Sequence, residues 1–312
     1  MEIAGIVFHQ VVIMFLLLAV GFILIKLKIL SPEVNRGLCG ILLKLVIPSS
    51  IISAYIKPFS VEQANQLALA FGLALIFHLM AALYGTLVFR KKEELNHKMQ
   101  RLAIVYSNCA FMGLPLLLAI FGEIGVFLGS AFIAIFNIFV WIHGIKTLNE
   151  KERIRPFKII CNPGTVAVLI GVLTYFLQIP YPPVVIATIR HIGGMTTPLA
   201  MIVVGGFLAA ISLKEMIKDG SVIFTSLSRL LFLPLLFILL LFLLRVSYWT
   251  DSSRIVALSM IVAAACPAAA TVVILPEMLH FDVRHGTKIL ALSTLLCIIT
   301  LPLVVWIAYL VL

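Results

Sequence analysis

The chain has 312 residues, of which 62% are hydrophobic and 12% are charged, and its mean hydropathy is +1.19. A soluble globular protein could not keep its surface hydrated with so few charged residues, so the composition excludes that class and indicates an integral membrane protein. The formal net charge of +10 is accounted for by orientation in the membrane and by anionic lipid headgroups, without a nucleic-acid partner.

Apolar runs dominate the chain, and most of them approach the ~20 residues that cross a ~30 Å hydrocarbon core. We predict ten transmembrane helices. Their expected ranges are Gly5–Ile25, Gly37–Ile56, Ala64–Phe89, Leu102–Phe121, Ile124–Leu148, Pro163–Ile179, Val184–Ala210, Val222–Leu244, Ile255–Pro276 and Ile289–Val311. No sizeable soluble domain is left between them, so function is expected within the bilayer.

The first run is interpreted as a transmembrane helix and not as a cleaved signal peptide, because an acidic start precedes it and no suitable cleavage site follows. The five cysteines, Cys39, Cys109, Cys161, Cys266 and Cys297, show no C-x-x-C spacing. We therefore expect no disulfide and no metal site. No Walker or dinucleotide-binding glycine motif is present, so no cofactor is expected either.

Lysine and arginine predict the orientation. The loops after the odd-numbered helices collect most of these residues: Lys26, Lys28, Arg36, Arg90, Lys91, Lys92, Lys98, Arg101, Lys146, Lys151, Arg153, Arg155, Lys158, Lys214, Lys218, Arg284 and Lys288. The opposite side holds Lys57, Arg190, Arg245 and Arg254. By the positive-inside rule, both termini face away from the cytoplasm of a multi-pass protein in the cytoplasmic (inner) membrane.

Prolines indicate an internal repeat. Pro48 and Pro198 lie 150 residues apart, in the second and seventh expected helices. Pro115 and Pro267 lie 152 residues apart, in the fourth and ninth. Each proline therefore corresponds to one in the helix five places later in the chain. Five crossings turn the second copy over, which predicts an inverted repeat. Residues 1–148 form the first five-helix unit, 149–162 a short cytoplasmic linker and 163–312 the second unit. Matched proline interruptions in two halves mark the midplane binding site of secondary transporters, although ordinary kinks are the alternative.

The fourth and ninth expected helices carry the candidate site. In the fourth, Asn108 is followed by Gly113 and Pro115, and in the ninth Pro267 stands among small residues that end at Thr271. The N-termini of interrupted helices present unpaired N–H groups and partial positive charge, which suit a carboxylate. The alternatives are tight helix packing for the alanine-rich stretch and a hydrogen bond to a neighbouring helix for Asn108.

Asn137 in the fifth helix either bonds to a neighbouring helix or contacts the ligand. We assign it to the site because a short turn at Gly122 and Glu123 joins its helix to the fourth. The G-x-x-x-G pair Gly125 and Gly129 predicts close helix packing. The candidate substrate contacts are therefore Asn108, Gly113, Pro115, Asn137, Pro267, Ala268 and Thr271, with helix breaks at Pro48, Pro115, Pro198 and Pro267.

The stretch from Asn108 to Leu117 resembles the N-x-x-x-x-G-x-P-L-L signature of the auxin efflux carrier family. Further stretches match in order along the whole chain: Phe136 to Trp141, Asn162-Pro163, Pro198-Leu199-Ala200 and Thr300 to Leu303. The resemblance implies a ten-helix inverted repeat whose crossover helices 4 and 9 form the substrate site. It also implies transport of small organic anions, an elevator-type movement and commonly a homodimer.

The short, basic segment between the two halves resembles bacterial members of that family, not the plant members with a long hydrophilic loop. The bacterial resemblance implies dicarboxylates such as malate or malonate, and the plant resemblance implies auxin-like monocarboxylates. Nothing in these residues selects one anion.

Other ionisable residues are rare at membrane depth. All 13 carboxylates fall in loops or at helix ends, which argues against a sodium–proton exchanger because such a protein needs a buried carboxylate. His9, His78 and His143 lie inside expected helices, where each is either a proton relay or a locally bonded residue. Lys44 and Arg229 are expected to extend towards the cytoplasmic face on their aliphatic stems, with substrate steering as the alternative.

The leading hypothesis is a secondary active transporter of small organic anions and not an enzyme. The alternatives are a sodium-coupled symporter similar to bile-acid carriers, an anion channel and an intramembrane enzyme. An enzyme would need a constellation such as H-E-x-x-H, which is absent from the sequence.

Overall fold

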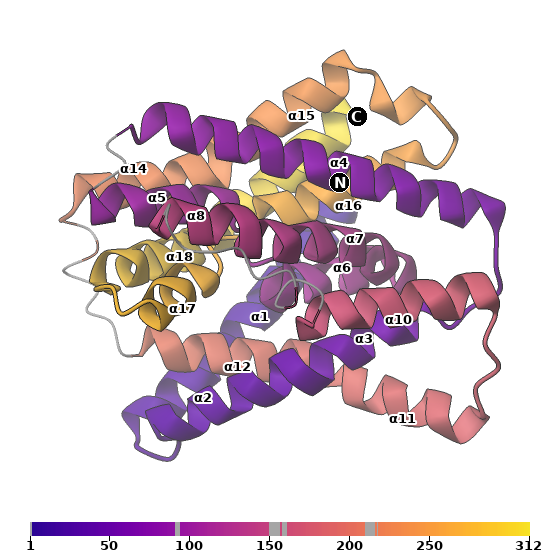
Figure 1. Cartoon of the computed structure of the whole chain (residues 1–312), viewed down its shortest axis with the longest axis horizontal. Coiled ribbons are helices and arrows are strands. Elements are labelled where there is room, and N and C mark those ends of the chain that lie inside the picture. Colours follow the sequence, from indigo (N-terminus) through magenta and orange to yellow (C-terminus); the bar gives the residue numbers. More distant parts are fainter. Residues whose placement is uncertain (1, 91–93, 150–156, 158–160, 210–215, 217) are drawn as a thin grey trace.

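The structure is a computed structural model that describes the chain except for residues 1, 91–93, 150–156, 158–160, 210–215 and 217 (Figure 1). Apart from one isolated antiparallel bridge between Ser107 and Ala268, the described residues contain no β structure. Seven helices in this part of the chain are long and apolar enough to cross a membrane. The expectation of an all-helical fold is therefore confirmed for the described residues, and the seven long apolar helices are consistent with a membrane protein.

The helical elements follow in this order: α1 (Glu2–Lys26), α2 (Pro32–Ile41), η1 (Leu42–Val46), α3 (Ile47–Tyr55), α4 (Val61–Val88), α5 (Leu95–Val105), η2 (Cys109–Gly113), α6 (Leu114–Phe121), α7 (Glu123–Phe139), η3 (Val140–Gly144), α8 (Ile145–Leu148), α10 (Pro163–Leu177), α11 (Pro183–Gly194), α12 (Thr196–Leu208), α14 (Gly220–Leu227), η4 (Ser228–Phe232), α15 (Leu233–Leu243), η5 (Val246–Tyr248), α16 (Ser253–Ala265), α17 (Thr271–Met278) and α18 (Arg284–Val311). The segments η1 to η4 are π-helical, with wider turns than an α-helix, and η5 is a 3₁₀-helix.

Three of the ten expected helices are shorter than a full span. They are the apolar helices Cys109–Phe121, Pro163–Leu177 and Ser253–Ala265. The first and third belong to the fourth and ninth expected helices, each of which is interrupted. The second, α10, ends because Gln178 adopts a left-handed conformation with φ of 48°, and its N–H then bonds to the carbonyl of Thr174.

Proline explains three of the four π-helical segments. The segments η1, η2 and η4 each precede a helix whose second residue is proline, namely Pro48, Pro115 and Pro234. Proline has no N–H and its ring displaces the carbonyl four residues back, so the preceding turn widens. The helix from Pro32 to Tyr55 consequently continues through Pro48, and a wide turn replaces the break expected there.

Pro198 differs from Pro48, because it is the third residue of α12 and follows a turn at Met195 that separates α11 from α12. Pro115 lies inside a helix that resumes at Cys109, so the interruption of the fourth expected helix precedes this proline by several residues. Pro267 lies within the interruption between α16 and α17.

The helices pack in two groups. In the first, α1 packs mainly on α12, and α3 packs on α10 and α11. In the second, α4 packs on α5, α7 and α16, and α18 packs on α14 and α16. The groups meet where α1 contacts α6 and α18, and where α7 contacts α3 and α10.

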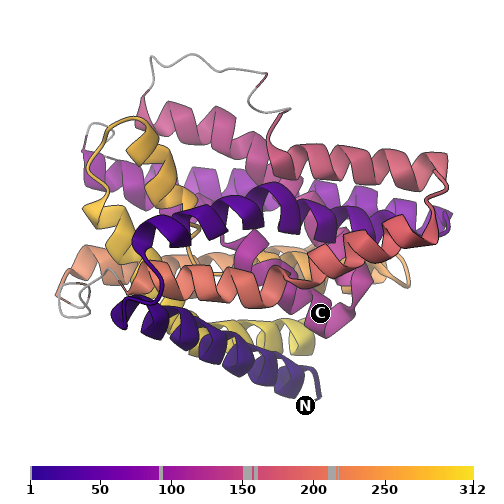
Figure 2. The ribbon, with the colours of Figure 1, turned by 90° about the horizontal axis from the view of Figure 1, so that it is seen from below.

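Most long helices run side by side along one direction, and the two chain ends lie near one another in both views (Figures 1 and 2). Several basic residues that predict the orientation lie outside the described residues: Lys91, Lys92, Lys151, Arg153, Arg155, Lys158 and Lys214. Most of the linker expected at 149–162 also lies outside them.

Candidate functional site

Two interrupted helices face each other. The first loses its helical form between the end of α5 at Val105 and its resumption at Cys109, and the second between Ala265 and Thr271. Tyr106 and Cys266, the residues after each first half, adopt extended conformations with ψ of 100° and 152°. Each interruption therefore frees backbone groups that a lipid environment cannot satisfy.

The freed groups pair with one another. The N–H of Asn108 donates to the carbonyl of Pro267 at 2.7 Å, and the N–H of Ala269 donates to the carbonyl of Tyr106 at 2.9 Å. The N–H of Ala268 also donates to the hydroxyl of Ser293 at 3.2 Å. We name the paired stretches, residues 106–108 and 267–269, the crossing segments. Their mutual hydrogen bonds explain how both interruptions persist away from water.

A cavity of about 280 Å³ adjoins the crossing segments. It lies between the restarting helices at Cys109 and Thr271, and its other walls come from η1 and α3, α7 and η3, and the start of α10. Most lining side chains are apolar, including Phe111, Phe136 and Leu275. Lys44 is the one charged side chain among these lining residues.

Hydrogen-bond donors without partners face this cavity. Asn108 and Asn137 are 5% and 8% exposed and line it, and their side-chain amides form no hydrogen bond within the described part of the chain. The N–H groups of Cys109 and Thr271, the first residues of the two restarting helices, have no partner within those helices, whereas the next three N–H groups of α17 bond to the carbonyls of Ala269 and Ala270. Cys109, Ala110 and Thr271, at or near the two helix starts, line the cavity. The helix dipoles make both starts partly positive, so the polar part of the cavity favours a negatively charged group.

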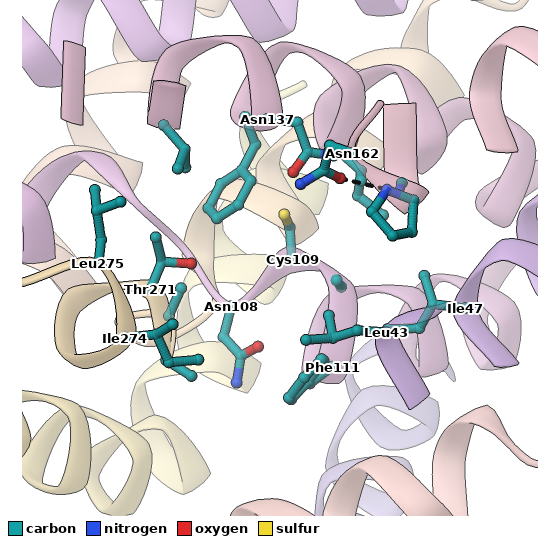
Figure 3. A pocket seen from close by; sticks show the side chains of 18 of the residues that line it. Leu43, Ile47, Asn108, Cys109, Phe111, Asn137, Asn162, Thr271, Ile274 and Leu275 are labelled. Carbon is teal, nitrogen blue, oxygen red and sulfur yellow. Dashed lines mark hydrogen bonds between the residues drawn. The ribbon is translucent and has the colours of Figure 1, made fainter. Parts of the chain in front are cut away.

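Figure 3 shows how the labelled side chains surround the cavity. Asn137 and Asn162 lie next to each other on one wall, while Asn108 comes from the crossing segment below them in this view. Thr271 stands on a third side with its α17 neighbours, opposite Leu43 and Ile47. The polar groups thus approach from separate elements and leave apolar surface between them.

Three of the seven expected substrate contacts, Asn108, Asn137 and Thr271, line the cavity. Gly113 instead faces α16, because a Cβ on it would lie 3.5 Å from the sulfur of Cys266. Pro115 is buried in α6.

The other two expected contacts belong to the crossing segments. Pro267 contributes its carbonyl to the N–H of Asn108, and Ala268, which is fully buried, pairs with Ser107. Both residues hold the two interruptions together and neither is among the residues that line the cavity.

Asn162 and Lys44 also line the cavity. Nothing in the sequence singles out Asn162 as a substrate contact, whereas for Lys44 substrate steering is the alternative to extension towards the cytoplasmic face. The side chain of Asn162 caps α10, accepting a hydrogen bond from the N–H of Gly164 at 3.0 Å. An Asn-Pro pair at a helix start is read as a cap, and no pattern in the sequence places that cap beside Asn137.

Buried ionisable residues correct one expectation. Arg229 does not extend to a membrane face, because it is fully buried and donates to backbone carbonyls of other helices. His78 is also fully buried, with Nδ1 2.7 Å from the carbonyl oxygen of Ala74. His143 lies 3.0 Å from the hydroxyl of Tyr106. The described carboxylates all lie in loops or in the terminal turns of helices.

A family model described as membrane transport protein matches residues 6–155 and 152–305. The two stretches together cover nearly the whole chain. The chain belongs to the auxin efflux carrier family. No curated protein matches it.

Membership in the auxin efflux carrier family confirms the resemblance carried by the sequence motifs, and it makes this chain a multi-pass membrane transport protein. A transporter family favours a role without catalysis over the alternative of an intramembrane enzyme. Among the described residues, no group of three or more histidine, cysteine, aspartate or glutamate side chains is arranged to hold a metal ion.

Proposed function

We propose that this protein is a secondary active transporter of small organic anions, and that the cavity beside the crossing segments binds the anion. The observation that carries the proposal is that polar groups from separate elements line one cavity: the buried amides of Asn108 and Asn137, which form no hydrogen bond among the described residues, and the positive helix starts at Cys109 and Thr271. These groups attract a carboxylate, while the apolar walls accept a carbon skeleton. The substrate class is mono- or dicarboxylates, auxin-like or malate- and malonate-like.

The proposed architecture is a ten-helix, five-plus-five inverted repeat with α5–α6 and α16–α17 as the crossover helices. Its units are residues 1–148 and 163–312, joined by the linker 149–162. In the cytoplasmic membrane with both termini outside, the cavity opens towards the cytoplasm, since its walls come from the inner halves of the proposed helices. Membrane lipids surround the protein, and a homodimer is the proposed assembly.

Alternating access requires the two helix groups to move relative to one another, as in an elevator. The hydroxyl groups of Tyr55 on α3 and Ser130 on α7 lie 2.6 Å apart, and the ring of Tyr55 packs 4.7 Å from that of Phe127. These contacts join the two groups at the end away from the cavity mouth. We interpret them as the closed outer side of an inward-facing state.

Uptake into liposomes tests the proposal. Purified protein should accumulate a labelled carboxylate with saturation kinetics, and Asn108→Ala or Asn137→Ala should weaken the apparent affinity about tenfold or more, as expected for a lost hydrogen bond to a charged group. Asn65→Ala is the matched control, because Asn65 is an exposed amide on α4 outside the cavity.

Each alternative gives a different result in the same assay. Flux that rises without saturation favours a channel, and uptake that requires sodium favours the sodium-coupled symporter. If no member of a broad panel of carboxylates is transported by the wild-type protein, the proposed function is refuted.

A further inference from the structure

Arg229 is a buried charge for which the described part of the chain supplies no carboxylate as counter-ion. It lies in η4 and is 0% exposed, and none of the ion pairs among the described residues includes it. Arginine stays protonated in proteins. A buried charge of this kind at membrane depth is costly and indicates a functional role, so the groups that balance it are informative.

The balancing groups are carbonyls in the last turns of α5 and α16, the first halves of the two interrupted helices. Nη1 donates to the carbonyl of Ile104 at 3.1 Å, and Nη2 donates to the carbonyl of Ala264 at 2.6 Å. Ile104 is the penultimate residue of α5 and Ala264 the penultimate residue of α16. One guanidinium group therefore bridges the C-terminal ends of both first halves, immediately before the crossing segments.

The charges balance. Each helix C-terminus carries roughly half an elementary negative charge, and two such ends together offset the single positive charge of one arginine. The face of the Phe77 ring adds a further favourable contact, with Cζ of Arg229 5.5 Å from the ring centroid. The Nε atom remains buried without a partner, so the guanidinium is held by the two helix ends and not by a complete set of hydrogen bonds.

In transporters with interrupted helices, the C-terminal ends and the unwound carbonyls are where coupling sodium ions bind. In this protein the guanidinium of Arg229 occupies that position between the two helix ends. We propose that Arg229 is a tethered cation that takes the place of a bound coupling cation between α5 and α16, so that transport needs no sodium. It is a positioning residue: by joining the first halves, it fixes the crossing segments and the helix starts that face the substrate.

The transport part of this inference rests on the proposed function, whereas the cation-binding part does not. Removing the guanidinium leaves two negative helix ends around an empty space, which a small free cation then fills. The thermal stability of purified Arg229→Ala protein should therefore be lower than that of the wild type in choline chloride. Sodium or guanidinium chloride at equal ionic strength should raise its melting temperature with saturation. The wild-type protein should show no such response.

Arg254→Ala is the matched control. Arg254 also donates to a backbone carbonyl, that of Tyr309 at 2.9 Å, but it is exposed and lies away from the crossing segments. Its loss should create no response to sodium. In liposomes, Arg229→Ala should lose about tenfold or more of its uptake in choline, in line with charged hydrogen bonds, and regain several-fold activity with either cation. Arg229→Lys should keep most of the wild-type uptake.

Three results would overturn the inference: wild-type uptake that requires sodium, an Arg229→Ala protein as stable and active as the wild type in choline, or a folded Arg229→Ala protein that no small cation stabilises. If Arg229→Ala does not fold, Arg229→Lys and Arg229→Gln replace it, and equal losses in both contradict a role for the charge. Failure of the wild type to transport any anion refutes the proposed function and leaves the melting experiments as an independent test.

Discussion

The amide of Asn137 lies where a side chain on Gly164 would have to stand. An ideal Cβ on Gly164 would be 2.6 Å from Nδ2 of Asn137 and 3.3 Å from Oδ1 of Asn162. Gly164→Ala should therefore rotate the Asn137 amide and weaken anion binding about tenfold, as expected when one hydrogen bond to a charged ligand is lost. The apparent affinity in the liposome assay measures this effect.

Gly72→Ala is the control for that change, since a Cβ there meets no atom within 4 Å and alanine is the better helix former. An unchanged affinity in Gly164→Ala would show that Asn137 does not contact the anion.

Lys57 lies outside the transmembrane helices, and its reactivity should depend on pH in an unusual range. Partial burial lowers its pKa from 10.5 to about 8, and the nearby carboxylate of Glu123 opposes that shift. Its Nζ lies 3.6 Å from the centroid of the Phe127 ring. Acylation of Lys57 should thus be half-maximal near pH 8, because only the neutral amine reacts.

Glu123→Gln should move that midpoint lower still, because it removes the charge that favours the protonated amine. Because the unfolded chain binds this proton more tightly, the contribution of Lys57 to stability should rise as the pH increases from about 8 towards 10.5. A labelling midpoint at the ordinary value for lysine would contradict the burial of Lys57.

Some of the residues at the candidate site can be predicted from the sequence, and others cannot. Asn108, Asn137 and Thr271 could be predicted as site residues, since an amide or hydroxyl beside a helix interruption stands out in an apolar segment. Arg229 could not be placed, because its acceptors lie 125 and 35 residues away in the chain. A basic residue near a helix end is expected to extend its side chain to the membrane face. The folded structure instead brings the carbonyls of Ile104 and Ala264 to Arg229, and these hold its side chain in the interior.

At the scale of elements, close approach between helices depends on glycine. A Cβ on Gly205 of α12 would lie 1.9 Å from the carbonyl oxygen of Leu18 in α1, and one on Gly21 would lie 2.1 Å from that of Ile202. Both contacts are with helix backbone, which cannot move aside as a flexible side chain can. Gly205→Ala should therefore force the two helices apart and cost about 1–3 kcal/mol of stability.

The melting temperature of the purified variant measures that loss. Gly194→Ala in the adjoining α11 is the matched control, because a Cβ at Gly194 meets no atom within 4 Å. Equal melting temperatures for both variants would contradict the packing of α1 on α12.

Helix existence was predictable from hydropathy, and the packing role of Gly125 was predictable from its spacing to Gly129: a Cβ on Gly125 would lie 2.3 Å from the carbonyl oxygen of Leu117. Whether a helix is broken or only widened at a proline could not be predicted from the sequence. Proline alone predicts a break at Pro48, yet the helix absorbs that proline with a π-helical turn. The interruption before Cys109 needs a partner segment for its freed backbone groups, and that partner is the distant stretch 267–269.

At the scale of the whole molecule, the orientation in the membrane is the prediction to test. Cys161 is the exposed cysteine among the five, and the other four are buried. A membrane-impermeant maleimide should label Cys161 in inside-out vesicles and not in right-side-out vesicles. Asp251→Cys, in a Cys161→Ser background, should show the opposite pattern, because Asp251 is exposed in the turn before α16 on the proposed outer side. The reverse labelling pattern would show that the protein has the opposite orientation in the membrane.

We propose that the two interrupted helices create an anion site between their restarting halves. An experimental structure of the protein in lipid, with a carboxylate that the uptake assay identifies as a substrate, would locate that site. We expect density for the carboxylate group beside Asn108 or Asn137, facing the first turns at Cys109 and Thr271. Substrate density elsewhere, or continuous helices in place of the crossing segments, would contradict it.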